Sequence, residues 1–216
     1  MIKRLLLLLF PPKCVLCKKL LAKEQTDLCP ACRENAPEFP ERKIKLSFLA
    51  QWTGVWYYKD DVRLSLLRYK FYGHRNYARS YGKLLAMKLQ RMGWDDTDVL
   101  TWIPISARRK FFRGFDQTEL IARVVAKELE LPLTAAVKKI RHTKPQSGMG
   151  DAAHRRANIL GAYRIPDPSL VKGKRILLLD DIITTGATAS ECARVLLTAG
   201  AKEVKLATVA VADHKR

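Results

Sequence analysis

The sequence predicts an α/β fold: an open, mostly parallel sheet with helices on its faces, preceded by a helical hood and by a small cysteine-bearing module. Three observations lead to this prediction. Strands alternate with helices from residue 98 onward, which is the order of a parallel sheet. Amphipathic helical stretches precede that region, and four cysteines stand in two close pairs near the N-terminus. We therefore expect three parts, at residues 1–40, 41–97 and 98–216.

The N-terminal part is expected to bind a structural zinc ion. Its cysteines form two C-x2-C pairs separated by eleven residues: Cys14, Cys17, Cys29 and Cys32. Two such turns can present four thiolates in the tetrahedral geometry of zinc, and a segment of about 40 residues is too small to build an adequate core alone. Two disulfides are the alternative, but nothing marks the chain as secreted, and thiols stay reduced in the cytosol. Cys192 stands at helical spacing among apolar residues and is expected in the core.

A short apolar run at residues 5–10 follows Lys3 and Arg4 and imitates a secretory signal. It is only six residues long, and Pro11 and Pro12 stand where a signal would have a small-residue cleavage site. No apolar run approaches the roughly 18 residues of a membrane helix. We expect no stable membrane insertion, a cytoplasmic location, and packing of residues 5–10 against the protein body, with membrane contact as the alternative.

The order of the remaining elements follows from apolar periodicity and turn residues. Pro37 and Pro40 mark the end of the module. In the hood we expect a strand at 53–58 and helices at 61–71 and 77–92. In the core we expect strands at 98–106, 135–140, 162–165, 175–179 and 204–211, and helices at 118–131 and 188–199, the second closed by Gly200.

One core strand is followed by two like charges. In RILLLDDIITTGATAS, residues 175–190, the apolar run reaches Leu179 and meets Asp180 and Asp181 before a threonine-rich loop and a helix. Such a turn lies at the carboxyl edge of a parallel sheet, where ligands bind. The helix start offers N–H groups to an anion, and Gly186 lets the backbone approach it closely.

The two acids suit the other half of such a ligand. They can accept hydrogen bonds from vicinal sugar hydroxyls, and a divalent cation would relieve their repulsion. A phosphorylated ribose satisfies both the acids and the loop. The alternative is that one aspartate serves only as a turn or cap residue.

These residues resemble the 5-phosphoribosyl-1-pyrophosphate (PRPP) motif of type I phosphoribosyltransferases, a hydrophobic strand followed by Asp-Asp-x-x-Thr-Thr-Gly-x-Thr. The resemblance implies that Asp180 and Asp181 contact the ribose hydroxyls as the catalytic acids, and that magnesium bridges ribose and pyrophosphate. It assigns the 5-phosphate to the loop residues Thr184, Thr185, Gly186, Ala187 and Thr188.

The order of motifs along nearly the whole chain is similar to that of ComF competence proteins. After the cysteines come RYKFYGHR at 68–75, IPISARRKFFRGFDQ at 103–117, QSGMGDAAHRRANILGAYRI at 146–165 and the PRPP motif. The resemblance implies a type I phosphoribosyltransferase fold with an N-terminal zinc finger. It also implies a place in natural transformation, with other competence proteins as partners.

The segment after the predicted strand 98–106 is basic. Its polar residues suit a pyrophosphate leaving group, with a solvated basic loop as the alternative: Ser106, Arg108, Arg109, Lys110 and Arg113. The family usually has Asn where this chain has Asp116. Asp116 and Glu119 predict a capping box, so we expect the change to be structurally quiet. The polar connection at 143–157 is either a loop that closes over the reaction or an ordinary surface loop.

From the sequence we expect a PRPP-binding protein that acts on or near single-stranded DNA, with an active phosphoribosyltransferase as the alternative. A working transferase would let an unidentified acceptor base attack PRPP and release pyrophosphate. A nucleic-acid factor would retain a PRPP site and bind single-stranded DNA through basic and aromatic residues, with Tyr69, Phe71 and Tyr77 as stacking candidates or as hood core. The formal charge of +19, from 40 Lys and Arg against 21 Asp and Glu, favours a polyanionic partner, with a solubilising surface as the alternative. A third possibility is a scaffold whose site is vestigial.

Overall fold

Four parallel strands form the centre of the molecule in the computed structural model, which describes residues 11–40, 45–94, 96–141, 143 and 157–212. They are β1 (Gln51–Tyr57), β2 (Val99–Trp102), β5 (Arg175–Ile183) and β6 (Glu203–Val211), in the spatial order β1-β6-β5-β2. All three pairings are parallel. The predicted parallel sheet is therefore confirmed. The run at 5–10 and nearly all of the connection at 143–157 lie outside the described residues.

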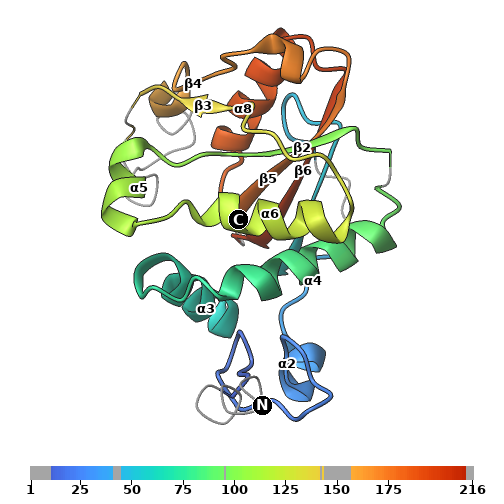
Figure 1. The fold of residues 1–216 in the computed structure, drawn as a ribbon, viewed down its shortest axis with the longest axis vertical. Coiled ribbons are helices and arrows are strands. Elements are labelled where there is room, and N and C mark those ends of the chain that lie inside the picture. The colour runs from blue at the N-terminus through green and yellow to red at the C-terminus, as the bar shows by residue number, and fades with distance from the viewer. Residues whose placement is uncertain (1–10, 41–44, 95, 142, 144–156, 213–216) are drawn as a thin grey trace, which may run out of the picture.

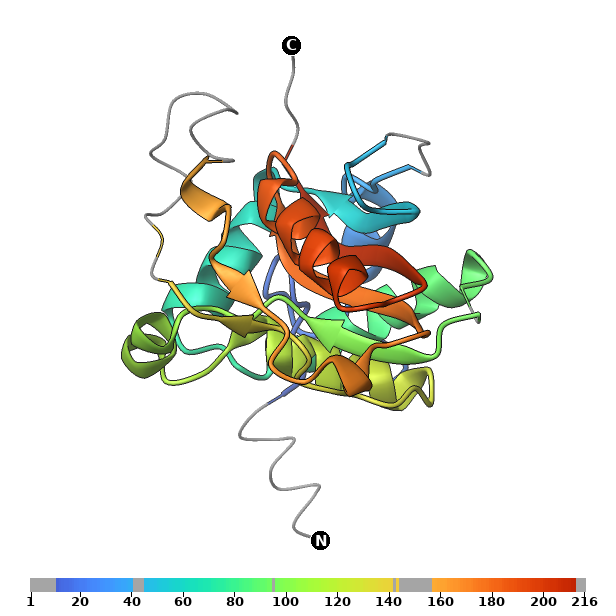
Figure 2. The ribbon, with the colours of Figure 1, turned by 90° about the horizontal axis from the view of Figure 1, so that it is seen from above.

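Helices cover both faces of this sheet (Figures 1 and 2). On one face lie α3 (Asp60–Phe71), α4 (Tyr77–Arg91) and α6 (Gln117–Glu128), and on the other α8 (Ala187–Thr198). Alternate residues of β5 divide between the two cores: Leu177 and Leu179 pack toward α4 and α6, and Ile176 and Leu178 pack toward α8. A strand buried on both faces must be apolar at every position, which explains its unbroken run of hydrophobic residues.

The strand predicted at 53–58 belongs to the sheet. We placed it in the hood, but β1 pairs with β6 along its whole length and forms an edge of the sheet. Residues 37–39 cover its outer side through the hydrogen bonds Phe39 N–H to Val55 O and Tyr57 N–H to Pro37 O. This cover protects an edge that would otherwise expose unpaired backbone groups. The range 41–97 thus supplies both hood helices and a core strand.

Three predicted strands are shorter than expected. The one at 98–106 ends at Trp102, because the following residues turn away into the short helix α5 (Ala107–Arg113). Those at 135–140 and 162–165 reduce to the antiparallel pair β3 (Lys138–Lys139) and β4 (Tyr163–Arg164). The 3-10 helix η2 (Pro168–Leu170) and α2 (Pro30–Asn35) complete the described elements. Within the described ranges, no helix has the length and apolar content needed to cross a bilayer.

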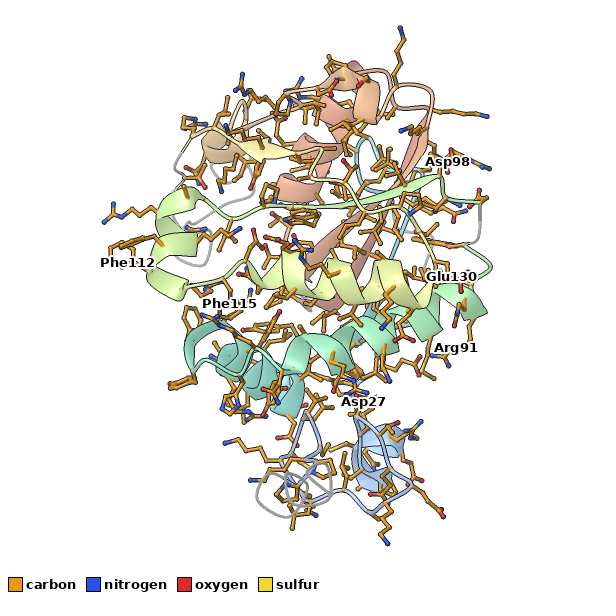
Figure 3. All side chains as sticks on the ribbon, in the orientation of Figure 1. Asp27, Arg91, Asp98, Phe112, Phe115 and Glu130 are labelled. Atoms are coloured by element: carbon orange, nitrogen blue, oxygen red, sulfur yellow. The ribbon has the colours of Figure 1, made fainter. Side chains whose placement is uncertain are left out.

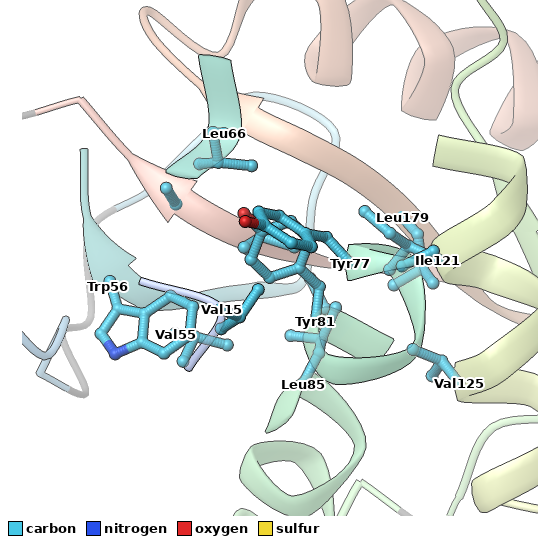
Figure 4. Packing of buried hydrophobic residues seen from close by; sticks show 14 of the residues in the cluster. Val15, Val55, Trp56, Leu66, Tyr77, Tyr81, Leu85, Ile121, Val125 and Leu179 are labelled. Carbon is cyan, nitrogen blue, oxygen red and sulfur yellow. The ribbon is translucent and has the colours of Figure 1, made fainter. Parts of the chain in front are cut away.

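Helices α4 and α6 approach each other closely at Gly82. A Cβ atom there would lie 2.5 Å from Val124 Cβ and 2.6 Å from Val124 Cγ1. Side chains cannot be that close, so the glycine sets the spacing between the two helices. The close spacing lets the two helices share one buried cluster, which includes Leu85 of α4 and Ile121 of α6 (Figure 4).

Gly82→Ala is expected to destabilise the protein by about 1–2 kcal/mol, because the overpacking of α4 against α6 outweighs alanine's better helix propensity. The free energy of unfolding in urea measures this. Combining it with Val124→Ala should recover much of the loss, and Arg79→Ala on the exposed side of α4 serves as a neutral control. A Gly82→Ala variant as stable as the wild type would contradict the close approach.

Candidate functional site

A cleft opens where β5 extends beyond the end of the neighbouring strand β2. The pairing with β2 ends at Trp102 and Leu179, with Ile103 N–H still bonded to Leu179 O, whereas β5 continues to Ile183 alongside β6. The chain after β2 diverges into α5, which leaves one edge of Asp180–Ile183 without a strand. The resulting cavity has a volume of about 930 Å³.

The two aspartates stand in the extended part of β5. We expected them after the strand, but Asp180 pairs with Thr208 of β6, and Asp181 follows it within β5. Alternation in a strand sends their side chains to opposite faces. Asp181 therefore points toward the hood, where Lys70 of α3 forms an ion pair with its Oδ1 at 2.9 Å.

Both carboxylates are confined. Asp180 Oδ1 accepts a hydrogen bond of 2.8 Å from the N–H of Asp181. Burial raises the pKa of Asp180 well above its usual value, the charge of Asp181 raises it further, and Lys70 opposes both effects. Asp181 Oδ2 is buried and has no hydrogen-bond partner among the described residues. A buried carboxylate oxygen without a donor is costly, so this atom is suited to a hydroxyl group of a ligand.

The threonine loop lies beside the acids at the start of α8. Gly186, at φ 76°, occupies the left-handed region that glycine tolerates, and it is the N-cap residue of the helix. Thr184 and Thr188 line the cavity, and the buried hydroxyl of Thr185 has no hydrogen-bond partner within the described ranges. Ala187 is the first helical residue. Free helix N–H groups together with these hydroxyls favour an anion here.

Helix α5 forms the opposite, basic wall. We expected a loop, but Ser106 caps a short helix by accepting a hydrogen bond of 3.4 Å from the N–H of Arg109. Three predicted anion-binding residues line the cavity: Arg108, Arg109 and Arg113. Lys110 does not, because its ammonium pairs with Glu119 of α6 at 3.0 Å. The arginines thus face the acids across the cleft, whereas Ser106 acts through the helix it caps.

Asp116 is the N-cap residue of α6. Its Oδ1 accepts hydrogen bonds from the N–H groups of Thr118 and Glu119, and its Oδ2 accepts one of 3.0 Å from Ile105 N–H. The predicted cap is therefore present. The reciprocal half of a capping box is missing, since Glu119 pairs with Lys110 and Arg123 instead.

Some cleft residues escaped the sequence prediction. Lys70 lies within RYKFYGHR but gave no sign of facing Asp181. The sequence offers Lys139 of β3 only as part of a basic stretch, 138–156, that suits DNA phosphates, and not as a residue of this cavity. Phe112 also lines the cavity, as does Phe71, which the sequence offers only as a stacking candidate or as hood core. No sequence pattern predicts that these residues lie at the cleft, because their positions depend on the packing of α3 near β5 and on the pairing of β3 with β4.

The four cysteines of the N-terminal module converge. Their sulfur atoms all lie within 4.8 Å of one another, and the Sγ atoms of Cys17 and Cys29 are 3.6 Å apart. A tetrahedral zinc ion with bonds of about 2.3 Å holds sulfur atoms about 3.8 Å apart, so the cluster fits zinc. The N–H of Cys32 lowers the pKa of the Cys29 thiol, whereas burial raises the pKa of the Cys17 and Cys32 thiols. Cys192 is buried in the α8 core as expected.

This module packs into the hood. Val15 and Leu16, between the first two cysteines, are buried, and Figure 4 shows Val15 among Val55, Trp56 and Tyr81. The hydroxyl of Ser65 on α3 donates to the Val15 carbonyl, and the guanidinium of Arg68 donates to the Leu16 carbonyl. The zinc-binding turn therefore contacts the same helix that carries Lys70.

Comparison with known proteins identifies two domains. Residues 118–216 match the phosphoribosyl transferase domain, and residues 5–44 match the double zinc ribbon domain. The chain is 24% identical to Competence protein F of Haemophilus influenzae, covering 90% of this chain and 94% of that protein.

Two further relatives cover comparable lengths. The chain is 28% identical to Competence protein ComFC of Bacillus subtilis, over 91% of this chain and 83% of that protein. It is 27% identical to the DNA utilization protein YhgH of Salmonella typhimurium, over 89% and 87%. Each of the three matches therefore covers about nine-tenths of this chain.

Protein purified under reducing conditions should contain one equivalent of zinc by metal analysis, and Cys14→Ser with Cys17→Ser should lose it. We expect the melting temperature to fall by about 10 °C or more, since Val15 and Leu16 lose their support and roughly 3 kcal/mol corresponds to such a shift. Cys192→Ala is the control and should keep its zinc. Wild-type protein without zinc would end the assignment.

Proposed function

We propose that this protein binds PRPP in the cleft and single-stranded DNA at the rim of the cleft. The proposal starts from its resemblance to ComF proteins, with a double zinc ribbon domain and a phosphoribosyl transferase domain. The observation that carries the first half is the adjacent pair of acids, the half-buried Asp180 and the buried Asp181. They lie at the open edge of β5, in one cavity with the threonine loop and the arginines of α5. Handling of transforming DNA in the cytoplasm, together with other competence proteins, is part of this proposal.

The groups of PRPP match the groups of the cleft. The vicinal ribose hydroxyls donate to the aspartates, where Asp181 Oδ2 has no donor of its own within the described residues. The 5-phosphate lies on the loop of Thr184, Thr185 and Thr188. The pyrophosphate faces the arginines of α5, in a cavity lined by six lysine or arginine side chains and two acids. Magnesium, brought by PRPP, would supply positive charge between the ribose and the pyrophosphate, near the two aspartates.

The same arrangement supports a second candidate, a transferase. An acceptor attacks the anomeric carbon, the bond from that carbon to the pyrophosphate oxygen breaks, and pyrophosphate leaves with the electron pair. The cations of α5 favour this step because they stabilise the charge that develops on the leaving group. The acceptor is an unidentified base.

The second half of the proposal rests on exposed aromatic side chains at the rim. Phe71 and Tyr72 at the end of α3 are 65% and 73% exposed, and Phe111 and Phe112 of α5 are 83% and 76% exposed. Figure 3 shows Phe112 projecting outward from α5. The rings of Phe111 and Phe112 lie next to each other, with 5.7 Å between their centres, and a contiguous apolar patch of this kind favours an interaction site.

Basic groups alternate with these rings. The Arg108 guanidinium lies 5.8 Å from the centre of the Phe112 ring, and that of Arg113 lies 5.2 Å from the centre of Phe71. Stacking platforms next to cations are typical of proteins that bind single strands. Of the stacking candidates named from the sequence, Tyr69 and Tyr77 are hood core, and Phe71 alone is exposed.

Titration calorimetry of magnesium PRPP into the wild type and into Asp180→Asn with Asp181→Asn tests the first half. We expect the variant to lose at least about 100-fold in affinity, because both acids accept hydrogen bonds from the ribose. Asp96→Asn with Asp98→Asn, a pair of acids engaged by Lys205 and Arg175, is the matched control. A folded wild type that binds no PRPP would refute the proposal.

Single-stranded DNA affinity should fall steeply between 50 and 200 mM salt, as roughly six or more phosphate contacts imply. Tyr72→Ala with Phe111→Ala should weaken binding at least about tenfold through lost stacking. Neither residue lines the PRPP cavity, so PRPP affinity should hold. Phe48→Ala, another exposed ring, is the control. A flat salt response, or equal affinity of the variants, would remove the DNA proposal.

A further inference from the structure

One ammonium group reaches the acids of the cleft from the hood. Lys70 of α3 donates to Asp181 Oδ1 at 2.9 Å, and the two side chains are only 17% and 6% exposed. The ion pair joins residues 111 positions apart and connects a hood helix to the central strand β5. Because both groups are largely shielded from water, salt screens this pair much less than a surface ion pair.

Three carboxyl groups lie near one another at this point. Burial raises the pKa of Asp180, and the charges of Asp181 and Asp116 raise it further. Backbone N–H groups already bind both oxygens of Asp116. Among the described residues, Lys70 is the only cation that forms an ion pair with any of the three acids. The electrostatic balance of the acid pair in the free protein therefore depends on this one side chain.

The ammonium occupies the place where a metal ion would bind directly. A divalent cation can relieve the repulsion between neighbouring carboxylates. Here Lys70 takes Oδ1 of Asp181, so that only Oδ2 of this residue is left without a partner within the described residues. Magnesium demands a nearly octahedral set of oxygen ligands, whereas a ribose hydroxyl needs one acceptor. The free oxygen therefore suits the sugar better than it suits the metal.

The backbone that carries Lys70 is held from the other side. Ser65 and Arg68 of the same helix donate to carbonyl groups of the cysteine module. The adjacent Tyr69 is fully buried, and its hydroxyl donates to the carbonyl oxygen of Gln117 at 2.7 Å. A lysine on a fixed backbone loses less conformational freedom when it pairs with a carboxylate. The position of the ammonium is thus part of the fold.

We propose that Lys70 is a built-in countercharge for the acid pair, so that the ribose 5-phosphate end of the ligand binds in the cleft without a divalent cation. The inference rests on the proposed function, since it concerns the same cleft. Magnesium carried by PRPP is then needed only at the pyrophosphate end, where phosphate oxygens of the ligand hold it. Lys70 is a positioning residue, because it acts on the ribose through Asp181.

Ribose 5-phosphate is the probe, because it has the sugar and the phosphate but no pyrophosphate to bring a metal ion. We expect the wild type to bind it equally well by calorimetry in magnesium and in EDTA. Lys70→Met should bind about 10- to 100-fold more weakly in EDTA, since the phosphate then approaches acids without a countercharge, and magnesium should restore most of the loss. Lys70→Arg keeps the charge and should resemble the wild type.

The matched control is Lys59→Met, which removes an exposed ammonium at the N-cap of the same helix, outside the cavity. It should behave as the wild type in magnesium and in EDTA. If Lys70→Met does not fold, Lys70→Gln, which keeps a hydrogen-bond donor without the charge, takes its place.

A second measurement separates the countercharge from a merely structural role. Manganese binds the same kind of oxygen ligands as magnesium, and paramagnetic resonance detects it directly. We expect the free Lys70→Met variant to bind manganese at least about tenfold more tightly than the wild type or Lys59→Met, because its acids lack their ammonium. A role in stability alone would leave manganese affinity unchanged, and that result would contradict the inference.

The outcomes also distinguish this inference from the proposed function. A wild type whose ribose 5-phosphate affinity depends on magnesium as strongly as that of Lys70→Met would overturn the inference. If the wild type binds magnesium PRPP, and Lys70→Met binds ribose 5-phosphate normally in EDTA, the proposed function stands and the countercharge is wrong. Metal-free binding of ribose 5-phosphate that requires Lys70, in a protein that binds no PRPP, would support the countercharge and refute the proposed function.

Discussion

Strand β5 continues for four residues after its pairing with β2 ends, and the position of every ligand-facing group depends on that difference in length. If β2 were as long, its backbone would fill the edge of Asp180–Ile183 and close the cleft. The chain after Trp102 leaves the sheet and forms α5 instead, which places basic side chains opposite the acids. One early departure from a strand thus creates both the space and its charged walls.

The two acids of the cleft differ in how many of their oxygens have a hydrogen-bond or ion-pair partner. Asp181 has Lys70 on one oxygen and no donor on the other within the described residues. Asp180 is held by a backbone N–H and by burial. On the far wall, the arginines and Lys139 outnumber the two acids. An excess of positive charge opposite a partly satisfied pair of acids suits a ligand that is anionic at its ends and hydroxylated in its middle.

The sequence was sufficient for elements that carry their own local signal. The apolar run of β5, the helix of α8 closed by Gly200 and the spacing of the cysteines each have a periodicity or motif that one segment contains. The prediction failed where contacts between segments distant in the sequence determine the position of a residue or strand. Whether β1 joins the sheet depends on its pairing with β6, and whether Lys110 faces the cleft depends on Glu119 of α6. The placement of Lys70 and Lys139 likewise requires the tertiary structure.

Helix α3 is the element that the distant parts of the molecule have in common. Ser65 and Arg68 engage the carbonyl groups of the zinc-binding turn, and Lys70, in the next part of the helix, engages Asp181. Figure 1 shows this helix between the N-terminal module and the sheet. The cysteine module therefore supports the helix that carries Lys70, although the four cysteines lie outside the cleft. We therefore expect zinc shortage to weaken the support of the helix that carries Lys70, although no residue of the cleft itself changes.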